Sequence, residues 1–103
     1  MRVRAVTRHH DDKDVTEVTV VNVGDRPVPA FLTRADVRRA SRSGVPLGGD
    51  DQVLPVLWSD NDVTLWPGES QTLTAVYRHE DLRGAAPAVT ISGWNVASQA
   101  VAA

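Results

Sequence analysis

Short segments in which apolar and polar residues alternate recur along the whole chain. The first covers residues 3–8, where Val3 and Ala5 share one side and arginines occupy most of the other. The clearest covers residues 15–23, which are β-branched almost throughout. Because successive side chains of a β-strand point to opposite faces, a period of two indicates a strand with one face toward a core. The pattern therefore predicts strands in both segments.

The same alternation continues through the rest of the chain, and turn-forming residues separate the segments. Further strands are predicted at residues 30–39, 53–58, 63–66, 70–78 and 88–96, with a glycine-rich loop at 41–51 and one helical turn at 79–83. This series of short strands predicts an all-β fold, an immunoglobulin-like antiparallel β-sandwich of about seven strands, with an open meander or small barrel as alternatives. We expect the domain to occupy residues 1–97 and residues 98–103 to form a flexible C-terminal tail.

The composition agrees with a single folded domain and excludes several classes of function. Among the 103 residues, 11 basic side chains are interleaved with 13 acidic ones, and the formal net charge is −2. A nucleic-acid-binding protein needs a concentrated basic field, so no nucleic-acid partner is expected. Cysteine is absent, which excludes disulfide bonds and thiolate metal sites. No apolar stretch approaches the roughly 20 residues that span a bilayer, so no membrane partner is expected.

Three stretches carry a resemblance to a known family. They are residues 31–37 (FLTRADV), 54–73 (LPVLWSDNDVTLWPGESQTL) and 92–96 (SGWNV), and the region from Trp58 to Glu69 is the most specific. In this order they resemble the C-terminal immunoglobulin-like domain of the exo-β-D-glucosaminidases and related β-mannosidases of glycoside hydrolase family 2. The resemblance covers most of the chain from residue 15 to residue 97.

The resemblance implies a parent enzyme whose chemistry lies outside this chain. Such an enzyme is a secreted, multi-domain glycoside hydrolase that removes glucosamine from chitosan with two glutamates on a (β/α)8 barrel, and a mannose-specific parent remains an alternative. The chain has no barrel, and its glutamates Glu17, Glu69 and Glu80 stand in no recognisable catalytic context. We therefore expect a non-catalytic accessory domain, without cofactor or catalytic residues, whose partners are the other domains of the parent. Because the start lacks the apolar region of a signal peptide, secretion would depend on a signal further upstream.

Two adjacent histidines and two aspartates raise the question of a metal site near the N-terminus. Imidazole and carboxylate are good ligands, but neighbouring strand residues point to opposite faces, so His9 and His10 cannot easily converge on one ion. His79 lies far along the chain in a predicted turn, and we expect it to complete no second cluster. The sequence therefore predicts a solvated hairpin tip at residues 9–12 and no metal.

A second acidic group lies between two predicted strands. The oxygens of Asp60, Asn61 and Asp62 could bind Ca²⁺. The sequence lacks the alternating ligands and bidentate glutamate of a calcium loop, and short Asx side chains often bond to nearby backbone groups. We predict a structural turn here.

The three tryptophans are the candidate contact residues, because exposed indoles can pack on another domain or stack on a sugar ring. Alternation places Trp58 toward the core and Trp66 at a strand end, partly exposed. If Val89 and Ile91 face the core, Trp94 and Val96 face outward as an apolar patch. Trp66, Trp94 and Val96 are therefore predicted to dock another domain; an independent carbohydrate-binding module, with chitosan or another polysaccharide as partner, is the alternative. Tyr77 is predicted to be a tyrosine corner or a core aromatic with a hydrated hydroxyl.

Overall fold

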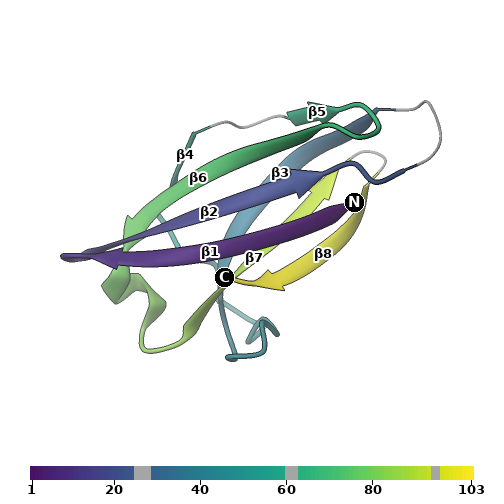
Figure 1. Ribbon diagram of the computed structural model, residues 1–103. Coiled ribbons are helices and arrows are strands. Elements are labelled where there is room, and N and C mark those ends of the chain that lie inside the picture. Colours follow the sequence, from purple (N-terminus) through teal and green to yellow (C-terminus); the bar gives the residue numbers. More distant parts are fainter. Residues whose placement is uncertain (25–28, 60–62, 94–95) are drawn as a thin grey trace.

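The computed structural model describes residues 1–24, 29–59, 63–93 and 96–103. Its elements are β1 (Arg2–His10), β2 (Lys13–Val21), β3 (Ala30–Ala40), β4 (Leu57–Trp58), β5 (Val63–Leu65), β6 (Ser70–Arg78), η1 (His79–Leu82), β7 (Ala86–Gly93) and β8 (Val96–Ala102). The strands form two four-stranded sheets, β1-β2-β6-β4 and β5-β3-β7-β8, in which every pairing is antiparallel. The two sheets lie face to face (Figure 1). The predicted all-β sandwich is confirmed.

The alternation seen in the sequence sorts each strand into an inner and an outer face. In β2, residues 14, 16, 18 and 20 are buried, whereas the residues between them are partly or fully exposed. Antiparallel pairing carries these inner positions across to β6, where Val18 faces Leu73 and Thr16 faces Ala75. On β1, Val3 and Ala5 turn inward and the arginines turn outward, as predicted.

The core between the sheets has two parts. One part is aliphatic and consists of Val18, Val20, Val63, Leu65, Leu73, Val89 and Ile91. The other lies toward η1 and consists of Val37, Val53, Ala75, Tyr77 and Leu82. Trp58 is partly buried and packs against both parts, so its predicted place at the core is confirmed.

The end of the sandwich beside η1 is closed by polar contacts to the loop of residues 41–51. Arg39 is buried on the inner side of β3, and its guanidinium donates to the backbone oxygens of Asp81 and Asp50. The backbone N–H of Arg39 donates to the Asp51 oxygen, and the N–H of Leu47 returns to the Arg39 oxygen at 3.0 Å. The predicted loop is therefore fastened to β3 on both sides.

The C-terminal segment differs from its prediction. Residues 98–103 were expected to form a flexible tail, but β8 pairs with β7 as far as Ala102, and the Ala103 N–H donates to the Pro87 oxygen. Val101 lies opposite the buried Val89. The tail prediction was wrong because small residues gave the segment little periodicity, whereas the open edge of β7 offers a full row of backbone partners.

The predicted strand at residues 53–58 is also shorter in the structure, where only Leu57 and Trp58 pair with β6.

Within the described residues, no helix has the length and apolar character needed to cross a membrane.

Candidate functional site

Among the residues predicted for docking, Trp66 lies at the end of the sandwich opposite η1. Trp66 follows β5 and is 54% exposed, so its expected exposure is confirmed. A tight turn holds its backbone: the Trp66 N–H donates to Glu69 Oε1 at 2.7 Å, and the Glu69 N–H donates to the Trp66 oxygen at 2.9 Å. Trp94 lies outside the described residues. Val96 begins β8, and its backbone pairs with Gly93.

The predicted structural turn at Asp60, Asn61 and Asp62 also lies outside the described residues. It stays a prediction.

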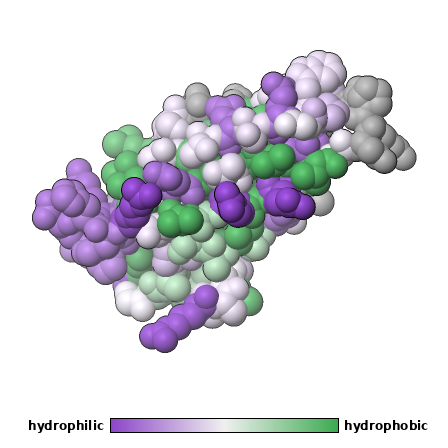
Figure 2. Space-filling model, viewed as in Figure 1, coloured by the Kyte–Doolittle hydropathy of each residue, from purple (hydrophilic) through white to green (hydrophobic). Residues whose placement is uncertain are grey.

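The outer face of the β1-β2-β6-β4 sheet carries a line of apolar side chains that the sequence analysis did not single out. Strand register places Arg8, Val15, Val76 and Leu57 side by side across the four strands. Leu57 is 75% exposed, and Val6, the preceding outward residue of β1, is 58% exposed. We call Val6, Val15, Leu57 and Val76 the outer stripe. Figure 2 shows hydrophobic and hydrophilic side chains interleaved on the face turned to the viewer.

Basic side chains surround the outer stripe. The outward, exposed positions of β1, β2 and β6 include Arg2, Arg4, Arg8, Lys13 and Arg78. Among the outward residues of these three strands, all of them described, the one carboxylate is Glu17. This face is therefore electropositive although the chain as a whole has a net charge of −2. A surface with complementary carboxylates would fit it.

The outer face of the other sheet carries a hydrogen-bonded ionic network. Arg38 Nη1 donates to Asp51 Oδ1 at 2.7 Å, and the Gly48 N–H donates to Asp51 Oδ2 at 2.9 Å. Gln52 Nε2 donates to Asp36 Oδ1 at 2.9 Å. The hydrogen bond from Arg38 lowers the pKa of the Asp51 carboxyl below its usual value, and the bond from Gly48 acts in the same direction. The network holds the 41–51 loop on the sheet.

A buried hydroxyl chain crosses the inner face of the first sheet. Tyr77 is 2% exposed, and its hydroxyl lies 2.8 Å from Thr16 Oγ1, which lies 2.8 Å from Thr7 Oγ1. The predicted core position of Tyr77 is confirmed. Its hydroxyl is buried and bonds to the side chain of Thr16, which lies diagonally across from it on the neighbouring strand. Burial raises the pKa of the Tyr77 phenol above its usual value.

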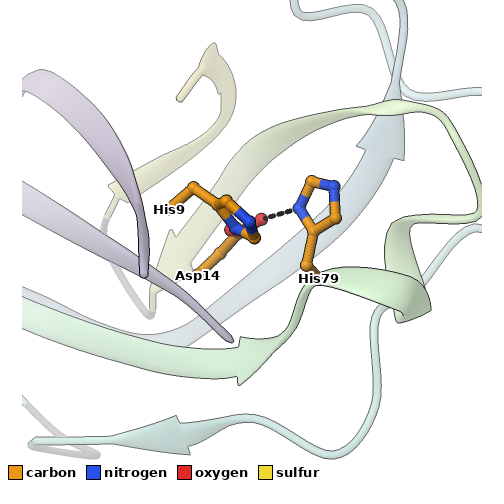
Figure 3. A group of neighbouring side chains, drawn as sticks. All are labelled: His9, Asp14 and His79. Atoms are coloured by element: carbon orange, nitrogen blue, oxygen red, sulfur yellow. Dashed lines mark hydrogen bonds and ion pairs between the residues drawn. The ribbon is translucent and has the colours of Figure 1, made fainter. Parts of the chain in front are cut away.

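A separate polar cluster beside this chain consists of His9, Asp14 and His79. Strand pairing sets His9 of β1 opposite Asp14 of β2, and Asp14 opposite Tyr77 of β6; His79 follows two residues later, at the start of η1. A backbone bond from the His79 N–H to the Asp12 oxygen ties η1 to the hairpin. Figure 3 shows both imidazoles turned toward the carboxylate.

The contacts within this cluster are short. His9 Nδ1 lies 2.7 Å from Asp14 Oδ1, and His79 Nδ1 lies 2.8 Å from Asp14 Oδ2. The ring centroids are 4.3 Å apart. The Asp14 side chain is 3% exposed, whereas the His9 and His79 side chains are 53% and 56% exposed.

The expectation that His79 completes no cluster was therefore wrong, and His9 is not a simple solvated tip. The adjacent His10 does behave as predicted: its side chain is 87% exposed, and it occupies an outward position of β1. The two-residue loop at Asp11 and Asp12 was the signal that could have paired His9 with Asp14. The contact with His79 depends on the order of strands in the sheet, which alternation alone does not specify.

Comparison with known proteins identifies the family. Residues 1–96 match the model of the exo-β-D-glucosaminidase Ig-fold domain. The chain is 48% identical over 99 residues to the exo-β-D-glucosaminidase of Streptomyces avermitilis (strain MA-4680), and 46% identical over 93 residues to that of Amycolatopsis orientalis. These matches cover 96% and 90% of this chain, but 10% and 8% of the two relatives.

Solved structures give the same result. The crystal structure of the Amycolatopsis orientalis exo-chitosanase CsxA matches 99% of this chain with a TM-score of 0.79 and 43% sequence identity, and the match covers 11% of that chain. A complex of the CsxA variant D469A with PNP-β-D-glucosamine matches with the same TM-score. The chain thus spans about a tenth of the proteins that it resembles, and it belongs to the family of exo-β-D-glucosaminidase immunoglobulin-fold domains.

Proposed function

We propose that this chain serves as a non-catalytic accessory domain of a multi-domain exo-β-D-glucosaminidase. The observation that carries the proposal is the extent of the matches, which take in nearly all of this chain and about a tenth of each relative. The remaining length of such an enzyme is ample for a separate catalytic domain. The domain would then contribute surface and stability, and the hydrolytic groups would lie elsewhere.

The positions of the glutamates support a non-catalytic role. A retaining glycosidase needs two carboxyl groups about 5 Å apart with different pKa values. Glu17 lies on the outer face of β2, Glu69 accepts a backbone hydrogen bond in the turn after β5, and Glu80 pairs with Arg78 at η1. Each glutamate thus belongs to a different part of the fold.

We propose that the outer stripe and its basic surround pack against another domain of the same enzyme. Leu57 and Val6 are more than half exposed on a sheet face, and cations beside them would pair with carboxylates on the facing domain. Trp66, Trp94 and Val96 remain predicted contact residues. Such an enzyme would act outside the cell, because a polymer like chitosan is too large to enter it.

Two measurements on the purified chain test the non-catalytic role. Incubation with glucosamine oligomers should release no glucosamine above the buffer control. Titration with chitosan oligomers, followed by amide chemical shifts, should give no saturable change. Turnover that co-purifies with the chain would overturn the proposal, and saturable shifts around Trp66 that disappear in Trp66→Ala would favour the carbohydrate-binding alternative.

The docking face is tested in the full-length enzyme. Leu57→Asp places a charge in the outer stripe and should lower the thermal stability of the whole enzyme, whereas the isolated domain should keep its own stability. Leu47→Asp, at another exposed leucine in the 41–51 loop, is the matched control. Equal effects of the two substitutions in the full-length enzyme would contradict the assigned face.

A further inference from the structure

We propose that His9, Asp14 and His79 form a binding site for one divalent transition-metal ion of the zinc type. Each ligand comes from a different element: His9 from the end of β1, Asp14 from the start of β2 and His79 from the first residue of η1. Their candidate ligand atoms all lie within 4.8 Å of one another. Figure 3 shows the three side chains converging from separate segments of the chain.

The donor set determines the class of ion. Two imidazole nitrogens and one carboxylate oxygen suit Zn²⁺ and its neighbours in the first transition row, which accept mixed nitrogen and oxygen ligands. Ca²⁺ and Mg²⁺ instead require shells made of oxygen atoms. Three protein ligands leave at least one position for water in a tetrahedral site.

The present distances are close to those that the ion needs. In a tetrahedral zinc site with bonds of about 2.0–2.1 Å, neighbouring ligand atoms are about 3.3 Å apart. The nitrogen-to-oxygen distances here are 2.7 Å for His9 and 2.8 Å for His79. Each nitrogen-to-oxygen pair would thus open by about half an ångström, and the ligand atoms, which now lie within 4.8 Å of one another, would draw together around the ion. Both imidazoles are more than half exposed and can make that movement, while the buried Asp14 stays fixed.

The charge of the site also favours a cation. Asp14 is nearly fully buried, and among the described residues its carboxylate forms hydrogen bonds and ion pairs with the two imidazole nitrogens and with no lysine or arginine. A buried carboxylate is costly unless it is paired, and a divalent ion would compensate its charge more strongly than hydrogen bonds to imidazoles do. The nearby Arg78 is engaged by Glu80.

Water and the ion can reach the cluster from the surface. An open pocket of about 280 Å³ lies beside it and is lined by His9, Asp11, Asp12, Arg78, His79 and Glu80. Its acidic side chains would attract a cation toward the histidines. When bound, the ion would join the β1–β2 hairpin to η1.

Isothermal titration calorimetry of the 103-residue chain with zinc sulfate tests the proposal. We expect one ion per chain, and a loss of affinity of at least roughly tenfold in His9→Ala and in His79→Ala. His10→Ala is the matched control, because it removes a neighbouring histidine on the opposite face of the same strand. Cobalt substituted for zinc should give visible absorption bands that disappear in the same two variants.

The variants must remain folded for this comparison. Circular dichroism checks each of them, and His9→Gln and His79→Gln, which keep an amide group that can donate to Asp14, repeat the measurement if an alanine variant unfolds. Absence of saturable zinc binding would overturn the site. Binding that falls as much in His10→Ala as in His9→Ala would overturn it as well, because the ion would then be held at the exposed hairpin tip.

Discussion

The substitution Leu73→Ala measures how much the aliphatic part of the core contributes to stability. Leu73 is 1% exposed on the inner face of β6, where it packs with Val18 and the facing sheet. Truncation of a fully buried leucine to alanine costs about 2–5 kcal/mol, because transfer free energy is lost and a cavity remains. We expect about 3 kcal/mol here, since strands on both sides and the facing sheet restrict collapse around the site.

This loss is large for a domain of this size. Domains of this kind have unfolding free energies of about 5–15 kcal/mol, so roughly a fifth to three fifths of the total would be lost. At about 4–8 °C per kcal/mol, the melting temperature should fall by about 12–24 °C. Urea unfolding followed by circular dichroism and tryptophan fluorescence gives the free energy, and thermal scans give the melting temperature.

Leu57→Ala is the control of the same chemistry. Leu57 is 75% exposed on the outer face, so its truncation should change the unfolding free energy by no more than about 0.5 kcal/mol. The denaturant slope should stay the same in both variants, because the surface exposed on unfolding hardly changes. Equal losses in the two variants, or a loss below about 1 kcal/mol for Leu73→Ala, would refute the assignment of inner and outer faces.

Three further predictions follow from the backbone and from buried polar groups. Gly44→Ala should lower the unfolding free energy by more than Gly48→Ala in urea titrations, because both have positive φ but a Cβ at Gly44 would lie 2.6 Å from a backbone atom of β8. Tyr77→Phe should cost about 0.5–1.5 kcal/mol and reduce the loss of stability above pH 10, because the raised pKa of Tyr77 keeps the folded phenol protonated where the unfolded one ionises. Since the pKa of Asp51 is lowered in the fold, the stability that it contributes is present above about pH 3.8 and declines below it; acid titration should show a smaller decline in Asp51→Asn and in Arg38→Met.

The alternation of apolar and polar residues predicted the fold because most strands have one buried and one solvent-exposed face. The period of two is unbroken in β2, and in β1 it separated Val3 and Ala5 from the arginines although Val6 lies on the exposed side. It failed at β8, whose small side chains have little contrast in hydrophobicity and whose pairing depends on the open edge of β7.

The cluster of His9, Asp14 and His79 shows the limit of reading one strand at a time. Local pairing across a two-residue loop specifies the contact of His9 with Asp14, so this contact could have been predicted from the sequence. His79 is 65 residues from Asp14. His79 lies near Asp14 because β6 pairs with β2 rather than with β5. This strand order depends on the packing of the whole sandwich.

The side-chain bonds between β1 and β2 bear on how the edge strand finds its alignment. The inward side of β1 is only weakly apolar, because Val3 and Ala5 are scarcely more apolar than Val6 on the opposite side, and the arginines supply most of the preference for one face. A slip by one residue would exchange these faces and turn the arginines into the core. The side-chain bonds of Thr7 with Thr16 and of His9 with Asp14 form in a single register, so they add to the preference that the arginines set and select one alignment of the hairpin.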